Sequence, residues 1–163
     1  MGKAVSDSSP KVNVEVSTRR NALGKTTDQV IHLDLPSSTQ LVYVIDAVIS
    51  EIASDMGFDK EETEQINLAV IEAAMNAIKH GNGEDSSKRT RFEFILNQEQ
   101  LTVVVEDQGV GFNRDNVADP LDPSNLLKSS GRGIFLMETC MDSVTFEASG
   151  RIVRMVKLRS ATD

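Results

Sequence analysis

Alternating apolar and polar side chains predict a strand that begins near Val30, the first ordered element expected along the chain. The alternating residues are Ile31, His32, Leu33, Asp34 and Leu35. A period of two is typical of a strand with one face buried and the other facing solvent. Pro36 lacks a backbone N–H and is expected to end this strand.

Two segments with helical spacing follow the strand. From Leu41 to Met56 the apolar residues recur every three or four positions. Ser37-Ser38 supplies an N-cap for this helix, and Gly57 is expected to end it. The second helix is predicted over Lys60–His80, where the run Gly81–Gly83 terminates it.

The remaining elements are two hairpins and a third helix. Residues Thr90–Leu96 and Leu101–Glu106 alternate about a short polar link and predict an antiparallel hairpin. Val144–Ala148 and Ile152–Leu158 predict a second one. The helix between the hairpins is expected to begin near Gly133 and to pass through Cys140.

This order of elements predicts an α+β fold, a two-layer sandwich in which helices cover one face of a mixed, mainly antiparallel sheet. In residues 1–27, which are rich in polar side chains, only the short alternation of Val12, Val14 and Val16 suggests a strand, and the segment is predicted to be a flexible N-terminal tail. One domain is expected over residues 28–160. Asn113–Ser130, with its two Asp-Pro pairs, is predicted to be a long loop or lid.

Composition narrows the functions that such a domain performs. With 17 Lys and Arg against 25 Asp and Glu, the net charge is −8, which disfavours direct binding to nucleic acid and suits a basic protein partner. The lone cysteine, Cys140, can form no internal disulfide, and no long apolar segment predicts a membrane span. We therefore expect a soluble, cytoplasmic protein.

A polar stripe on the second helix carries the first candidate chemistry. At about 100° per residue, Glu72, Asn76, Lys79 and His80 share one face of an otherwise apolar helix. A solvated face is the ordinary explanation of such a stripe. The alternative is a Mg-nucleotide site, in which Asn76 supplies a neutral oxygen to Mg²⁺ and Glu72 orients or deprotonates an attacking hydroxyl.

Two glycine clusters extend the hypothesis. Asp107 ends a strand and can accept a hydrogen bond from an exocyclic amine such as that of adenine, while Gly109 and Gly111 let backbone approach a flat ring. Gly131 and Gly133 open a helix, whose exposed N–H groups attract phosphate. Each cluster alone is also explained by a tight turn or by a helix start without a ligand.

Two other glycine motifs are rejected. Gly24-Lys25-Thr26 is similar to the end of a phosphate-binding P-loop, but Arg19 stands where that motif requires glycine. The pair Gly109 and Gly111 is similar to a dinucleotide fingerprint, but position 114 is Arg and no parallel βαβ unit follows.

In this order the three motifs resemble the nucleotide-binding boxes of the ATPase superfamily that contains gyrase, a heat-shock chaperone, histidine kinases and mismatch-repair proteins. Within it, the chain most resembles the anti-sigma factor serine/threonine kinases of bacterial partner-switching systems. Two segments carry this resemblance: EAAMNAIKHG at Glu72–Gly81 and GRGIFLMETCMD at Gly131–Asp142. It extends over roughly residues 30–160.

The resemblance implies a histidine kinase-like ATPase fold and a site for ATP and Mg²⁺. It gives Glu72 the role of catalytic base, Asn76 that of magnesium ligand and Asp107 that of adenine-binding residue, with Asn113–Ser130 as the ATP lid. The other residues implied in ATP binding are Lys79, His80, Gly109, Gly111, Gly131, Arg132, Gly133 and Ile134.

The resemblance also implies a biological role. Such a protein sequesters a sigma factor and phosphorylates a serine or threonine of an anti-anti-sigma antagonist, commonly as a homodimer, in transcription programmes such as stress response or sporulation. A binding module that ATP gates without phosphoryl transfer is the alternative, and Glu72 favours the kinase over it. A detached histidine kinase catalytic domain is disfavoured, because no helical hairpin with a phosphoacceptor histidine precedes the domain.

Overall fold

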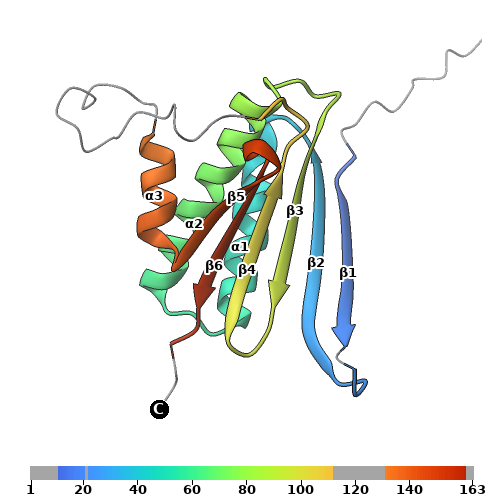
Figure 1. Ribbon diagram of the computed structural model, residues 1–163, viewed down its shortest axis with the longest axis vertical. Coiled ribbons are helices and arrows are strands. Elements are labelled where there is room, and N and C mark those ends of the chain that lie inside the picture. The colour runs from blue at the N-terminus through green and yellow to red at the C-terminus, as the bar shows by residue number, and fades with distance from the viewer. Residues whose placement is uncertain (1–10, 21, 112–130, 161–163) are drawn as a thin grey trace, which may run out of the picture.

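The computed structural model describes residues 11–20, 22–111 and 131–160, and over these ranges the chain forms a six-stranded sheet with helices on one face (Figure 1). The strand order is β1-β2-β3-β4-β6-β5, and every neighbouring pair is antiparallel. The strands are β1 (Asn13–Arg20), β2 (Thr26–Pro36), β3 (Arg89–Leu96), β4 (Gln100–Glu106), β5 (Ser143–Glu147) and β6 (Ile152–Leu158).

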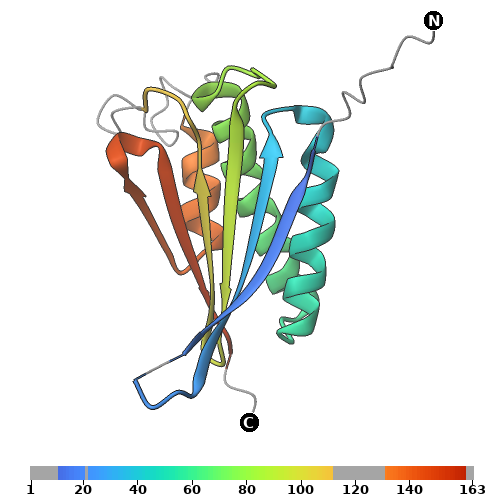
Figure 2. The same ribbon diagram turned by 90° about the vertical axis from the view of Figure 1, so that its right-hand side faces the viewer.

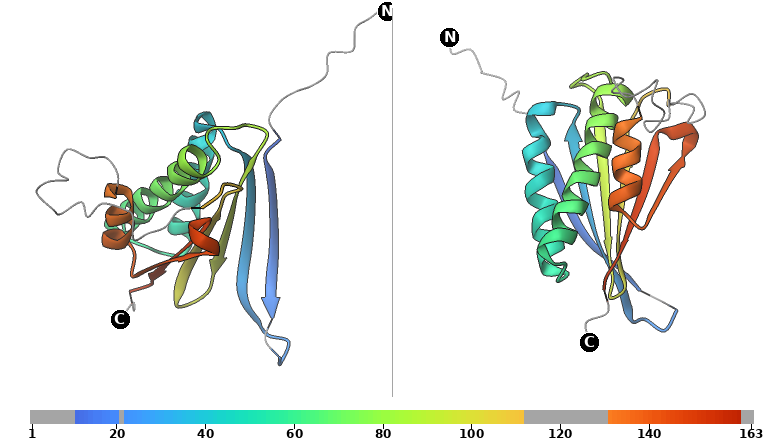
Figure 3. Two further views of the ribbon diagram at one scale, coloured as in Figure 1. Left: turned by 45° about the horizontal axis from the view of Figure 1, so that its top comes forward. Right: turned by 90° about the vertical axis from the view of Figure 1, so that its left-hand side faces the viewer.

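The helices gather in a second layer against the sheet, as both views of Figure 3 show. They are the 3₁₀-helix η1 (Thr39–Leu41), α1 (Val42–Asp55), α2 (Lys60–Met75), the π-helix η2 (Asn76–Gly81) and α3 (Arg132–Cys140). The predicted α+β two-layer arrangement is confirmed. Among the described strands the sheet is antiparallel throughout rather than mixed.

The core lies between the two layers and follows from the alternation along the strands. On β2, Leu33 and Leu35 are each 1% exposed, while Asp34 between them lies on the open face of the sheet. On β3, the rings of Phe92 and Phe94 stack with centroids 6.3 Å apart. Full burial of one such side chain contributes about 1.5–3 kcal/mol, and a slip by one residue would forfeit it, which fixes the strand register.

Helix α2 lies between α1 and α3 (Figure 3) and places the candidate site. It begins with a capping box, in which Asp59 Oδ1 accepts the Glu62 N–H at 2.8 Å and Glu62 Oε2 accepts the Asp59 N–H at 3.0 Å. Small side chains are buried along α2 and η2: Ala69, Ala73, Ala74 and Ala77. They let the neighbouring helices pack closely, so polar side chains of α2 reach the backbone of α3.

The structure corrects the expectation of a flexible tail over residues 1–27. Asn13–Arg20 forms the edge strand β1 (Figure 2), paired with β2 from Asn13 opposite Asp34 to Arg20 opposite Thr26. Arg19 also pairs with Glu93 of β3 at 2.7 Å. The composition of this segment is polar because an edge strand that the helical layer does not cover buries little of either face. Residues 1–10 lie outside the described ranges.

Two further predictions are refined. Ser38 Oγ accepts the Gln40 N–H at 3.3 Å and caps η1, whereas Ser37, predicted to share this capping role, is fully buried and hydrogen-bonded to Thr90.

The rejected P-loop lookalike Gly24–Thr26 lies in the connection between β1 and β2 and at the start of β2. The predicted lid, Asn113–Ser130, lies outside the described residues.

Candidate functional site

The first part of the site is the contact between α2 and the beginning of α3. A Cβ placed on Gly133 would lie 2.8 Å from Oε2 of Glu72 and 3.4 Å from Nδ2 of Asn76. Cβ atoms essentially never come within 3 Å of such a neighbour, so a side chain at position 133 would force the Glu72 carboxylate to move and would crowd the Asn76 amide. The sequence hypothesis joined Glu72, Asn76 and Gly133 in one site, and the structure brings these three residues together.

Glu72 and Asn76 are half-buried and unusual in lacking polar partners. Within the part of the chain that the structure describes, neither side chain forms a hydrogen bond or an ion pair. A partly buried carboxylate and amide without partners forgo the compensation that polar groups normally obtain on burial. A ligand that brings a cation and donors to this point would supply it.

The end of the second helix departs from the prediction. Lys60–His80 was expected to be a single α-helix, but from Asn76 to Gly81 the backbone forms the π-helix η2. A π-helix has i to i+5 hydrogen bonds and a wider turn, so the rule of 100° per residue fails beyond Asn76. Lys79 and His80, predicted to share the face of Glu72, are both exposed on η2.

The second part of the site is the turn after β4. Asp107 is 7% exposed, its Oδ1 accepts the Gly109 N–H at 2.7 Å, and its own N–H donates to the Arg151 carbonyl at 3.0 Å. No described residue donates to Oδ2 of Asp107. Oδ2 of Asp107 is therefore available to accept from a ligand, while Oδ1 and the backbone N–H of Asp107 are held by hydrogen bonds.

Burial governs the charge of this carboxylate. Desolvation raises the pKa of Asp107 above its ordinary value, while the hydrogen bond from Gly109 and the positive charge of Arg151 act in the opposite direction. A carboxylate in such an environment is a good acceptor for an exocyclic amine, because the hydrogen bond from the ligand replaces the hydrogen bonds to water that burial removed.

Glycines surround Asp107 because there is no room for side chains. A Cβ on Gly81 would lie 2.7 Å from Asp107 Oδ1, and one on Gly109 would overlap the Gly81 carbonyl oxygen. Gly111 has φ of 80° and lies against the Ser149 carbonyl. Gly109 and Gly111 were predicted to belong to the site, whereas Gly81 had been interpreted only as a helix terminator.

The third part is the start of α3. Gly131 caps the helix with φ of 90°, a left-handed conformation that favours glycine, and its carbonyl accepts the Phe135 N–H at 3.0 Å. Arg132 is exposed, and the side chain of Ile134 packs against the core. The first N–H groups of α3 thus begin beside Glu72 and Asn76, as a phosphate site at a helix N-terminus requires.

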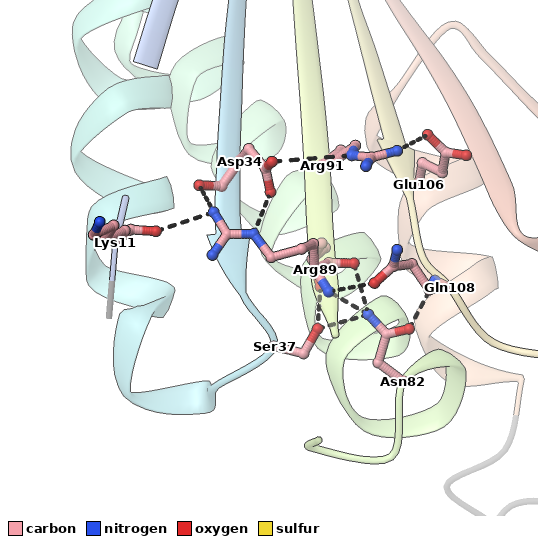
Figure 4. A network of polar contacts seen from close by, with 9 residues as sticks. Lys11, Asp34, Ser37, Asn82, Arg89, Arg91, Glu106 and Gln108 are labelled. Carbon is pink, nitrogen blue, oxygen red and sulfur yellow. Dashed lines mark hydrogen bonds and ion pairs between the residues drawn. The ribbon is translucent and has the colours of Figure 1, made fainter. Parts of the chain in front are cut away.

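Helix η2 connects the two halves of the site, since it begins at Asn76 and ends at Gly81 beside Asp107. Sequence reasoning missed three residues at this junction: Gly81, Asn82 and Gln108. Asn82 and Gln108 join the end of η2 to the Asp107 turn (Figure 4). The signal for Gly81 was its position directly after His80, at the end of the helix that carries the polar stripe.

A separate hollow on the open face of the sheet is not part of this site. It is lined by strands β1 to β4, and Arg91 within it pairs with Asp34 at 4.0 Å and with Glu106 at 3.8 Å. The described residues contain no group of three or more His, Cys, Asp or Glu arranged to hold a metal. None of the helices in the described ranges has the length and apolar character needed to span a bilayer.

The chain is similar to known proteins over most of its length. The family model of the histidine kinase-like ATPase domain matches residues 35–157. The serine-protein kinase RsbW of Bacillus subtilis (strain 168) is 33% identical over 140 residues, covering 82% of this chain and 88% of that protein. RsbW of Halalkalibacterium halodurans is 32% identical over 136 residues (79% and 83%), and RsbW of Staphylococcus epidermidis 32% over 143 residues (82% and 89%).

The fold, the site between α2 and α3 and the matched family model define the class: the chain belongs to the histidine kinase-like ATPase family. Within that family, its relatives at more than 30% identity over most of their length place it among the serine-protein kinases. The resemblance drawn from the three motifs is thereby confirmed.

Proposed function

We propose that this chain is an anti-sigma factor that binds Mg-ATP and phosphorylates a serine or threonine of an anti-anti-sigma antagonist. The observation that carries the proposal is the contact of Gly133 with Glu72 and Asn76. It combines a base, a magnesium ligand and a helix N-terminus at one point, as phosphoryl transfer requires. The protein kinase activity accords with its place among the serine-protein kinases.

Each part of ATP has a complementary group in the site. Asp107, with Oδ2 unused by the described residues, accepts a hydrogen bond from the adenine amine, and Gly109 and Gly111 border the base. The backbone of Gly131–Ile134 holds the phosphates. The exposed side chains that complete the site are Lys79, His80 and Arg132.

Asn76 is the proposed magnesium ligand. Mg²⁺ binds few protein groups and takes its other ligands from phosphate oxygens and water. The unpartnered amide of Asn76 fits this requirement, and its neutral oxygen leaves the adjacent Glu72 free for another role. When bound, the ion would neutralise charge on the phosphates.

Glu72 is the proposed general base. Its carboxylate faces the start of α3, one helical turn from Asn76, and has no hydrogen-bond partner among the described residues. There it accepts the proton of the attacking serine or threonine hydroxyl, or orients that hydroxyl toward the terminal phosphate. A protein that only bound ATP would not need a carboxylate at this position.

We propose protein partners rather than nucleic acid, and a cytoplasmic location. The net charge of −8 favours a basic surface on a sigma factor and disfavours direct contact with DNA. Cys140, the only cysteine, is buried and free, which suits a reducing compartment. The family resemblance is the support for a role in stress response or sporulation.

A homodimer is part of the proposal. Edge strand β1 and the residue before it present three exposed valines, with exposed fractions of 38% for Val12, 59% for Val14 and 58% for Val16. An apolar row on an unpaired sheet edge invites association with another copy of the chain.

The anti-sigma role is tested by mixing the full chain and ATP with each sigma factor of the same genome and measuring complexes by size-exclusion chromatography. One sigma factor should co-elute with the chain, and an unphosphorylated antagonist should release it. If no sigma factor binds in the presence of either ATP or ADP, the anti-sigma role is refuted, although the kinase activity could stand with another regulator as target.

A further inference from the structure

A buried polar cluster lies next to the turn that follows β4, where the end of η2 meets the C-terminal end of β2 and the start of β3 (Figure 4). Its members are almost inaccessible: Ser37 and Thr90 are 0% exposed and Asn82 is 2% exposed. The hydroxyls of Ser37 and Thr90 are 2.9 Å apart. The great majority of buried polar groups in proteins have hydrogen-bond partners, and those of this cluster do.

Asn82 is the centre of the cluster and uses both ends of its amide. Its Nδ2 donates to Ser37 Oγ at 2.6 Å and to the Arg89 carbonyl at 3.0 Å. Its Oδ1 accepts the backbone N–H of Gln108 at 2.7 Å. The cluster is therefore connected to the backbone of the turn that holds Asp107.

Gln108 is held a second time, through its side chain. Its Oε1 accepts the backbone N–H of Arg89 at 2.6 Å. Since Gln108 stands between Asp107 and Gly109, these two bonds fix the middle of the turn. The direction of the Asp107 carboxylate follows, because the Gly109 N–H is bonded to it.

Asn82 is itself fixed relative to the phosphate half of the site. Its backbone N–H donates to the carbonyl of Ala77 at 2.8 Å, within the helix η2 that begins at Asn76. Asn82 therefore joins the element that carries the proposed magnesium ligand to the turn that carries the proposed adenine acceptor.

We propose that Asn82 is a positioning residue for the nucleotide, and that Asn82 and Gln108 together hold Asp107 in the orientation that recognises the adenine amine. This inference rests on the proposed ATP site and goes further, because it assigns base selectivity to two residues that do not themselves touch the ligand. It predicts that substitutions of Asn82 or Gln108 reduce the preference of the site for a nucleotide whose base carries an exocyclic amine over a nucleotide whose base lacks it.

The test compares dissociation constants for ATP and for inosine triphosphate, which carries an oxygen in place of the adenine amine. The matched control is Asn67→Ala, since Asn67 Nδ2 also donates to a serine, Ser50 Oγ at 2.9 Å, but between α1 and α2. Urea unfolding of every variant separates stability from affinity.

Asn82→Ala is expected to weaken ATP binding about tenfold and to lower the ratio of ATP to inosine triphosphate affinity by a similar factor. Asn82→Asp keeps an oxygen for the Gln108 N–H and loses the amide donor. It should bind ATP more tightly than Asn82→Ala even if it is no more stable. Asn67→Ala should be less stable than wild type and bind both nucleotides normally.

Gln108→Ala provides a variant whose folding is not in question, because this side chain is exposed. It should weaken ATP binding several-fold and reduce the preference for ATP. Wild-type affinity and selectivity in either Gln108→Ala or a folded Asn82→Ala would overturn the inference. If the wild-type chain bound neither nucleotide, the proposed ATP site itself would be refuted, and this inference with it.

Discussion

The backbone of Gly133 lies so close to Glu72 that a single added methyl group would stand 2.8 Å from the Glu72 Oε2 atom. Two segments that lie 61 positions apart in the sequence, at Glu72 and Gly133, thus form one surface. The helix N-terminus supplies N–H groups and the helix beside it supplies a carboxylate. The first prediction follows from this contact.

Gly133→Ala is predicted to weaken ATP binding by about tenfold, because the methyl group displaces the Glu72 carboxylate and crowds the Asn76 amide. Isothermal titration calorimetry measures the change. Gly83→Ala is the control: with φ of 67° it carries backbone strain, but nothing lies within 4 Å of its added Cβ. It should lose stability and keep its affinity. Equal affinities for Gly133→Ala and wild type would contradict the close-approach argument.

Asn76→Ala is predicted to abolish the magnesium dependence of ATP binding. The amide brings a neutral oxygen to within 3.8 Å of a Cβ placed on Gly133, so its removal leaves the ion without the proposed protein ligand. Binding is measured with magnesium and with a chelator present. Wild type should bind much more tightly with magnesium, and the variant equally weakly in both. A variant that retains magnesium-dependent affinity would show that the ligand lies elsewhere.

Asp107→Asn is predicted to lose ATP affinity by roughly 10- to 100-fold without losing stability at neutral pH. Its amide oxygen still accepts the Gly109 N–H, but the amide cannot reproduce the carboxylate that accepts from adenine. Binding is compared at pH 7.5, and unfolding free energies are measured from urea titrations across the acidic range.

The pH dependence of Asp107 has a definite sign. Burial raises the pKa of Asp107, so the folded state binds the proton more tightly than the unfolded chain. The resulting stability is complete below the ordinary pKa of an aspartate and is lost as the pH rises through the raised value. Asp107→Asn should lack this loss, and should therefore gain stability relative to wild type as the pH rises through that window. If the free energy of unfolding of Asp107→Asn fell relative to that of wild type as the pH rose through this window, the argument that burial raises the pKa of Asp107 would be contradicted.

Val14→Lys is predicted to convert the proposed homodimer into a monomer, since it places a charge in the exposed valine row of β1. Light scattering after size exclusion measures the mass. The side chain is 59% exposed, so the substitution should leave the fold of the protomer intact, and any fall in the unfolding midpoint should come from the lost association. A dimer of unchanged mass would show that association uses another surface.

Periodic apolar residues in long segments made most of the fold predictable, whereas a short alternation in a polar segment did not reveal β1. Leu33 and Leu35 alternate with polar neighbours because one face of β2 is buried, so this strand was evident from sequence. The valines of β1 show the same alternation but remain exposed, and the strand depends on pairing with β2. Such pairing leaves little trace in composition, which is why β1 was interpreted as part of a tail.

The site was predictable where residue chemistry is distinctive and not where it depends on backbone geometry. The sequence patterns single out three polar residues. Glu72 and Asn76 form a polar stripe on an apolar helix, and Asp107 stands between a strand and a glycine-rich turn. The π-helix over Asn76–Gly81 has no sequence period to distinguish it from an α-helix. Asn82 follows a helix end, where an asparagine is ordinary, so only the structure shows that it is buried and joined to Gln108.

The most direct test of the central claim is transfer of the labelled γ-phosphate of Mg-ATP to candidate antagonist proteins, compared between wild type and Glu72→Gln. The substitution keeps the size of the side chain beside Gly133 and removes the base. Wild type should label a serine or threonine of one antagonist. The variant should bind ATP with near-normal affinity and transfer at least 100-fold more slowly, the lower end of what a general base contributes. Equal transfer rates would contradict the role of Glu72, and ATP binding without labelling of any candidate would favour a module that ATP only gates.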